Sequence, residues 1–206
     1  MATAVFVDGP GLYHAALKDR VGRWLDLRAW TASILPGLTI GRIHYFSAWA
    51  NPPFPNKVDR QRVYLRALAT VPIVTVHMGR GRIDDRTVRT VGSRPSQVRV
   101  HVPRQKGVDV ALATALLTES ALRQCDTAVV VTADSDLRPA LRAAREEFDV
   151  RLGIVNPLPG RRSMALREDA DFHLRPAQTS YLAAQFPLTM SDQHGSFRAP
   201  KGWAQK

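Results

Sequence analysis

The chain has 206 residues, 45% of them hydrophobic, a length that suits one domain with a single core rather than two independent ones. Its 29 Lys and Arg residues against 18 Asp and Glu residues give a net charge of +11, which favours a polyanionic partner. The single cysteine excludes an intrachain disulfide and a cysteine zinc site, and no apolar stretch approaches the ~18 residues that a membrane helix needs, so we expect a soluble cytoplasmic protein without a membrane partner.

Short runs rich in Val, Ile and Phe alternate along the chain with segments of helical periodicity. This alternation is typical of a parallel sheet that is covered by helices on both faces. The predicted strands are residues 3–7, 39–47, 73–77, 127–132 and 150–155. The predicted helices are residues 11–18, 27–35, 57–69, 108–122 and 137–148. The predicted fold class is therefore α/β with a mainly parallel central sheet.

Residues 79–104 interrupt this alternation with a concentration of arginine against two acids, Asp84 and Asp85. Strand-like stretches flank the turn signal GSRPS at 92–96, which predicts a hairpin that projects arginine side chains. Such an arm, running into Lys106, would grip the phosphates of a polyanion. The alternatives are a solvated loop, or an arginine-rich surface that serves solubility alone.

The end of the chain carries weaker signals. Residues 164–170 are predicted as a short helix and residues 170–174 as a last edge strand or turn. We place the domain at residues 1–175 and a tail at residues 176–206, partly disordered or packed on the domain or on a partner. Within the tail, residues 194–206 are expected to be disordered.

Four aspartates stand where an α/β fold would gather them. Asp8 directly follows the first predicted strand, Asp134 follows the fourth, Asp136 begins the next helix, and Asp109 lies in the first turn of the helix at 108–122. Ligands of open parallel sheets bind outside the carboxyl ends of the strands. Gathered carboxylates repel one another unless a cation offsets the repulsion, and hard oxygen ligands favour Mg²⁺ or Mn²⁺. The pattern predicts a metal site.

Each acid also has a purely structural interpretation. Asp134, Ser135 and Asp136 are residue types that cap helix N-termini, and Asp109 is a favourable charge in a first helical turn. Asp8 is less easily explained, because the Gly-Pro-Gly that follows it needs no cap beyond the turn.

Four sequence blocks carry a resemblance to a known family. VFVDGPGLYHAAL, RQKGVDVALATALL and VVVTADSDLRPALRAARE resemble the signature blocks of the NYN domain, a branch of the PIN-like nuclease superfamily, and LREDADFHL resembles its closing segment. The resemblance implies a three-layer α/β/α, Rossmann-like fold and metal-dependent RNA cleavage, with these metal-binding and catalytic acids: Asp8, Asp109, Asp134 and Asp136. Two positions depart from the pattern: Gly11 stands where the family has asparagine, and Thr114 where it often has a further aspartate.

The first hypothesis is therefore a ribonuclease in which Mg²⁺ or Mn²⁺ activates water against the RNA backbone. The residues expected to contact RNA are Lys106, Arg99, Arg104, Arg80, Arg82, Ser135 and Thr132. A second hypothesis is an RNA-binding or assembly protein with weak or no activity, motivated by Gly11 and Thr114. A third, hydrolysis of a small phosphate ester, is disfavoured because Asp8 lacks the partner acid of a DxD motif. Proteins of this superfamily often pair, so a homodimer is a candidate assembly.

Overall fold

The computed structural model describes residues 2–49, 55–91, 97–158 and 166–204 of the chain. Its centre is a seven-stranded sheet in the order β4-β3-β2-β1-β5-β6-β7. The strands are β1 (Thr3–Asp8), β2 (Ile40–Ala48), β3 (Val74–Arg89), β4 (Gln97–Lys106), β5 (Thr127–Val131), β6 (Arg151–Val155) and β7 (Phe172–Leu174). The β3–β4 pair is antiparallel, and the other neighbouring strands run parallel.

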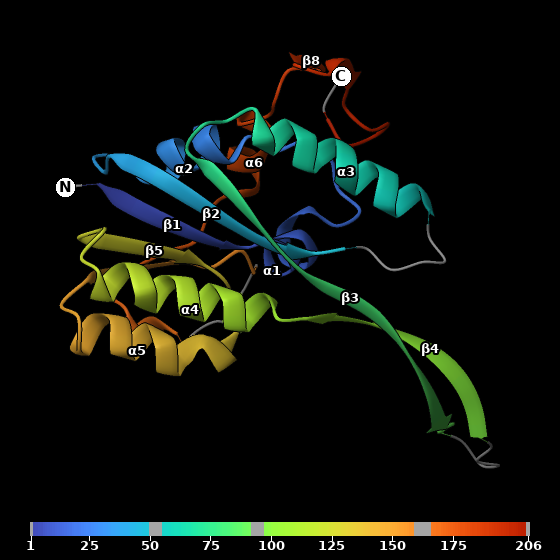
Figure 1. Cartoon of the computed structure of the whole chain (residues 1–206), viewed down its shortest axis with the longest axis horizontal. Coiled ribbons are helices and arrows are strands. Elements are labelled where there is room, and N and C mark those ends of the chain that lie inside the picture. Colours follow the sequence, from blue (N-terminus) through green and yellow to red (C-terminus); the bar gives the residue numbers. More distant parts are fainter. Residues whose placement is uncertain (1, 50–54, 92–96, 159–165, 205–206) are drawn as a thin grey trace.

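Helices cover both faces of the sheet (Figure 1). One face carries α4 (Val108–Ala121) and α5 (Arg138–Glu146), and the other carries α2 (Leu27–Ile34), α3 (Pro55–Ala69) and α6 (Gln178–Ala183). A short helix, α1 (Gly9–Leu12), follows β1 and continues into a π-helical turn, η1 (Tyr13–Leu17). The three-layer α/β/α arrangement with a mainly parallel sheet confirms the predicted fold class.

Strand β1 shows why its sequence is apolar at every position before Asp8. Val5 and Val7 pack with Trp24 on the side of α2 and α3, whereas Phe6 packs with Leu112 on the side of α4. Successive side chains of a strand point to opposite faces, so a strand covered on both faces has no position for a solvated side chain. A carboxylate at the end of such a strand is therefore held at the rim of the core.

The order of the strands reverses between β1 and β5. The chain runs outward from β1 through β2 to β3, and after the hairpin it returns to the other side of β1. The register pairs Val7 with Val131, so β1 and β5 end side by side and place Asp8 next to Thr132. Such a reversal is where open α/β sheets bind ligands.

Strand β3 is much longer than predicted. The predicted strand ends at residue 77, whereas β3 runs to Arg89. Its first part pairs with β2 as far as Gly79, and from Arg80 to Arg89 it pairs with β4 instead. The reason is that no turn signal separates the two parts, and a Cβ at Gly79 would lie 2.6 Å from the carbonyl oxygen of Lys106 where β4 returns. The hairpin prediction is confirmed, and the arm projects well beyond the helices (Figure 1). Residues 92–96 lie outside the described residues.

The prediction that residues 194–206 are disordered is wrong for residues 194–204. Strands β8 (Thr189–Asp192) and β9 (Gly195–Arg198) form a hairpin, and Trp203, only 8% exposed, accepts a hydrogen bond from the backbone N–H of Gly22 (3.0 Å) through its carbonyl. Arg66 of α3 binds both carboxylate oxygens of Asp192, at 2.7 and 2.6 Å. The tail therefore packs on the domain; residues 205 and 206 are outside the description.

Two smaller differences concern the segments around β7. In place of the helix predicted at 164–170, the described residues contain one 3₁₀ turn, η3 (Arg167–Asp169), and residues 159–165 are not described. The edge strand predicted at 170–174 is present as β7. Across the described ranges, no helix combines the length and the apolar content that a membrane span requires.

Candidate active site: an acidic cluster beside a basic arm

Asp8 is the most deeply placed of the four predicted acids. It ends β1 with 6% of its surface exposed. Its Oδ1 accepts a hydrogen bond from the backbone N–H of Gly11 (2.9 Å), and its Oδ2 accepts one from Thr132 Oγ1 (3.2 Å). Burial raises the pKa of Asp8, the two hydrogen bonds offset part of the rise, and the charges of Asp109 and Asp134 add to it.

Thr132, directly after β5, ties Asp8 to Asp134. The Thr132 side chain is fully buried, and its Oγ1 also accepts from the backbone N–H of Asp134 (3.0 Å). Asp134 Oδ1 in turn accepts from the backbone N–H of Asp136 (2.9 Å) and caps the turn η2 (Ser135–Leu137). The capping interpretation is therefore confirmed for Asp134. Ser135 and Asp136 lie within the turn that Asp134 caps, and both are exposed.

Asp109 completes the cluster from α4. The preceding Gly107 has a φ of +85°, a conformation that glycine adopts without strain, and it starts the helix so that Asp109 lies in the first turn. Asp109 is exposed, yet burial and then the charges of Asp134 and Asp136 raise its pKa. The raised pKa values of Asp8 and Asp109 share two causes, namely burial and the charge of Asp134, which acts on both carboxylates. The structure thus gathers the four acids at one rim of the sheet.

Carboxylates are the ligands that a hard divalent cation prefers, and the mutual repulsion of these four is what such a cation would offset. The side chains are not assembled around one point, however: in the described ranges, no three Asp, Glu, His or Cys side chains are grouped as metal ligands would be. Both oxygens of Asp8 serve internal hydrogen bonds. The acids therefore fit Mg²⁺ or Mn²⁺ in chemical kind and charge, and binding would require their side chains to rotate.

The base of the arm adjoins this cluster. Arg80 and Lys106 are direct partners across the β3–β4 ladder, both are exposed, and Lys106 precedes Asp109 by three residues. Like charges directly opposite each other on a ladder are unfavourable unless an anion lies between them. Arg82 and Arg104 are the next partners in register, but their side chains lie outside the described part.

Arg99 occupies a different place from the one expected. It lies seven residues before Lys106 on β4, about 23 Å along the strand, and its guanidinium pairs with Asp85 at 2.9 Å. Arg99 is therefore suited to contact a distal part of a bound strand rather than the acids.

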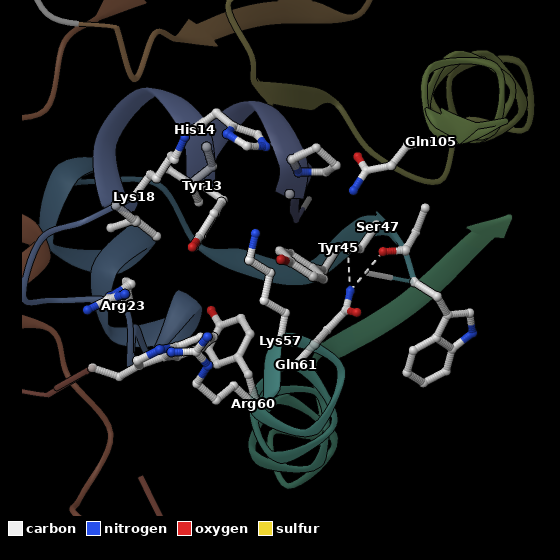
Figure 2. A pocket seen from close by; sticks show the side chains of 18 of the residues that line it. Tyr13, His14, Lys18, Arg23, Tyr45, Ser47, Lys57, Arg60, Gln61 and Gln105 are labelled. Atoms are coloured by element: carbon white, nitrogen blue, oxygen red, sulfur yellow. Dashed lines mark hydrogen bonds between the residues drawn. The ribbon is translucent and has the colours of Figure 1, made fainter. Parts of the chain in front are cut away.

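Sequence reasoning missed a cavity of about 580 Å³ whose wall begins at Gly9, the residue after Asp8. Gly9 and Pro10, which follow Asp8, form part of its wall, and α3 forms the opposite side (Figure 2). Its remaining walls come from η1 and the segment that follows it, from β2 and β4, and from Trp203 near the end of the chain. No local signal could have revealed it, because the lining residues are dispersed along the sequence and come together only in the tertiary fold.

Comparisons with known proteins agree with this architecture. A crystal structure of a protein of unknown function from Vibrio parahaemolyticus superposes with a TM-score of 0.56 at 14% identity, over 85% of this chain and 93% of that one, and shares its fold. The 6-hydroxy-3-succinoylpyridine 3-monooxygenase HspA of Pseudomonas putida is 25% identical over 238 residues, covering 98% of this chain and 75% of that protein. The family model of the NYN domain matches residues 2–176. The chain therefore belongs to the NYN domain family.

Proposed function

We propose that the protein is a metal-dependent ribonuclease that hydrolyses phosphodiester bonds of RNA. The observation that carries the proposal is Asp8, a buried carboxylate at the strand-order reversal whose charge is opposed by those of Asp109 and Asp134. Membership of the NYN family supports nuclease-like chemistry. The arginine-rich arm that begins beside the acids supports a polyanionic substrate.

In this proposal, Asp8, Asp109, Asp134 and Asp136 hold Mg²⁺ or Mn²⁺. The bound cation lowers the pKa of water and stabilises charge on the phosphate. Thr132 positions two of the acids through its single hydroxyl. The reaction adds one water across a P–O bond, which leaves a phosphate on one product and a hydroxyl on the other.

The basic side chains hold the substrate rather than perform the chemistry. Lys106 and Arg80 lie beside the acids and would neutralise the phosphates that flank the scissile bond. Ser135, exposed in the first turn of η2, offers a hydroxyl to the same backbone. Arg99 and the rest of the arm extend this contact away from the acids.

The test is cleavage of labelled single-stranded RNA with Mn²⁺ by the full chain. Asp134→Asn is expected to slow cleavage at least about tenfold, because metal sites lose that much even when supporting residues are changed. Asp149→Asn is the matched control. Asp149 is exposed, precedes the amino end of β6 on the rim opposite the carboxyl ends of the parallel strands, and has a φ of 55° that asparagine tolerates. Equal cutting by wild type and the Asp134 variant contradicts the proposal.

A second candidate function is RNA binding without turnover. It is favoured by the conformation of Asp8. One oxygen of its carboxylate accepts a hydrogen bond from the backbone N–H of Gly11 in α1, so that oxygen is not available to a metal ion. This candidate predicts salt-sensitive RNA binding that survives loss of the carboxylates, and no metal-dependent cutting. The name of the Pseudomonas relative denotes oxygenation of a pyridine. Hydroxylation of such a compound by this chain, with neither RNA cleavage nor RNA binding, would exclude both candidates.

A further inference from the structure

The cavity beside Asp8 has the size and position of a ligand site. Its volume of about 580 Å³ lies in the range that encloses small organic ligands. Gly9 forms its wall at the end of β1, where a Cβ would lie 2.7 Å from the hydroxyl oxygen of Tyr45. Gly9 thus joins the wall of the cavity directly to Asp8 along the chain.

The cavity is positively charged. Lys18, Arg23, Lys57 and Arg60 line it, against one acid, Asp19. Figure 2 shows Lys57 reaching from α3 into the space between Tyr13 and Tyr45. Burial lowers the pKa of His14, and the nearby charges of Lys18 and Lys57 lower it further. Such a field favours an anionic ligand.

Two donors in the cavity wall lack a hydrogen-bond partner within the described ranges, namely Arg23 Nε and Trp203 Nε1. Arg23 is held by Nη2, which donates to the carbonyl of Gly202 (2.8 Å), and its guanidinium lies 5.7 Å from the centre of the Trp203 ring. Buried polar groups are rarely left without a partner. Both atoms are enclosed by the protein, so an acceptor in the cavity would reach them only if the Arg23 and Trp203 side chains shifted.

Aromatic rings form the rest of the lining. Trp49, directly after β2, is 42% exposed and lines the cavity together with Tyr13, whereas Tyr64 in the same wall is only 7% exposed. Exposed flat rings in a basic groove are the surfaces on which nucleobases stack. Gln105 adds an amide group that can read the edge of a base, whereas the Gln61 amide already donates to Ser47 Oγ and to the carbonyl of Ala48.

We propose that this cavity binds one nucleotide of an RNA strand, with the base against the aromatic wall and the phosphate against Lys57 and Arg60. The proposal rests on the ribonuclease function, because a nucleotide seated here would direct the adjoining phosphate past Gly9 toward Asp8 and the other acids. The site would then fix which phosphodiester bond meets the acidic cluster.

The test is calorimetric titration of the full chain with adenosine 5′-monophosphate and cytidine 5′-monophosphate in metal-free buffer. We expect at least one to bind, and the corresponding nucleoside, which lacks the phosphate, to bind about tenfold more weakly. Lys57→Gln is expected to weaken nucleotide binding about tenfold, and Trp49→Ala to weaken it for nucleotide and nucleoside alike. Arg62→Gln is the matched control, because Arg62 lies on the same helix, is 66% exposed and pairs with Asp59.

Binding and cleavage are separable in this design. Asp134→Asn should still bind the mononucleotide although it no longer cuts RNA. Three results would overturn the nucleotide site whatever the outcome of cleavage: no binding at millimolar nucleotide, equal binding by the Lys57 and Arg62 variants, or tighter binding of a pyridine carboxylate than of either nucleotide. Conversely, if nucleotide binds and the Asp134 variant still cuts, the acidic-cluster mechanism fails while the cavity assignment stands.

Discussion

The backbone N–H of Gly11 donates to Asp8 Oδ1 at 2.9 Å, and the Asp8 carboxylate occupies the space that a Cβ on residue 11 would need. Asp8 therefore acts as the N-cap of α1. The departure from the family pattern at Gly11 has a structural consequence, because the missing side chain is what allows the carboxylate to fold back over the helix. The same carboxylate is the central ligand of the proposed metal site.

Gly11→Asn should force the Asp8 carboxylate out of its capping position. Loss of a cap costs about 1 kcal/mol, so the metal-free variant should melt about 2–4 °C below wild type. Mn²⁺ should raise the melting temperature of the variant more than that of wild type, because the carboxylate no longer competes with the Gly11 N–H. Thermal denaturation with and without Mn²⁺ measures both effects.

Gly37→Asn provides the comparison for that experiment. Gly37 has a φ of +83° and open space around its Cβ position, so asparagine is tolerated there and no carboxylate is displaced. An identical Mn²⁺ response in the Gly11 variant, the Gly37 variant and wild type would show that Asp8 takes no part in binding the cation.

Thr132→Val should destabilise the fold and disturb the titration of Asp8. Valine keeps the volume but removes the hydroxyl that donates to Asp8 and accepts from the Asp134 N–H, at a cost of about 1–3 kcal/mol in the free energy of unfolding. The pKa of Asp8 should rise further, since the lost hydrogen bond favours the ionised carboxylate. Urea denaturation and NMR titration measure the two effects. Thr132→Ser, which keeps the hydroxyl, should behave nearly as wild type, and a valine variant equal to the serine variant would refute the bridging role.

The raised pKa of Asp8 predicts a pH-dependent contribution to stability with a definite sign. Because the folded state holds the proton more tightly than the unfolded chain, whose Asp8 pKa is near 3.8, the contribution of this group falls as pH rises from about 4 through its raised folded pKa. As the pH rises across that window, the free energy of unfolding of wild type should therefore fall relative to that of Asp8→Asn. Mn²⁺ should reduce the change, because it stabilises the ionised form.

Asp192 offers the opposite case in the same chain. The hydrogen bonds from Arg66 hold its pKa well below the usual range, so its contribution is present above the unfolded pKa and is lost as pH falls. Urea denaturation of wild type, Asp8→Asn and Asp192→Asn across pH 3–7 should give differences of opposite slope for the two variants. Parallel slopes would contradict the electrostatic assignment of Asp8.

The basic arm predicts the salt dependence of RNA binding. Removing one phosphate contact should lower the slope of log affinity against log salt by about 1, so Arg80→Gln and Lys106→Gln should each reduce it. Arg28→Gln, an exposed change on α2 across the sheet, should leave the slope unchanged. Fluorescence anisotropy with labelled single-stranded RNA at several salt concentrations measures the slopes, and equal slopes for all three variants would show that the arm base does not contact phosphate.

The sequence was sufficient to predict the sheet and the placement of Asp8 and Asp134 at the ends of their strands, because both follow from local patterns. Strand β1 is apolar throughout since it is covered on both faces, and parallel neighbours necessarily bring their carboxyl ends to one rim. The orientation of the Asp8 carboxylate was not predictable in the same way. It depends on the space left by Gly11, a contact between side chain and backbone that no periodicity encodes.

The cavity and the tail were missed for a different reason. Trp203 reaches Tyr64 and Arg23, which are more than a hundred residues earlier in the chain, and the apolar residues between β9 and the end of the chain are too sparse to form a periodic pattern. Composition therefore suggested disorder. Packing partners that distant in sequence are fixed by the tertiary fold alone.

The packing of the tail supplies the last prediction. Trp203 is 8% exposed and its ring lies 6.0 Å from that of Tyr64, so Trp203→Ala should lower the free energy of unfolding by about 3–5 kcal/mol. Trp49→Ala removes the same side chain from a position that is 42% exposed and should change stability by only about 0.5 kcal/mol. Urea denaturation compares the two variants. Equal stability of the Trp203 and Trp49 variants would mean that the tail does not pack on the domain. Since Trp203 also lines the cavity, its loss should weaken nucleotide binding as well.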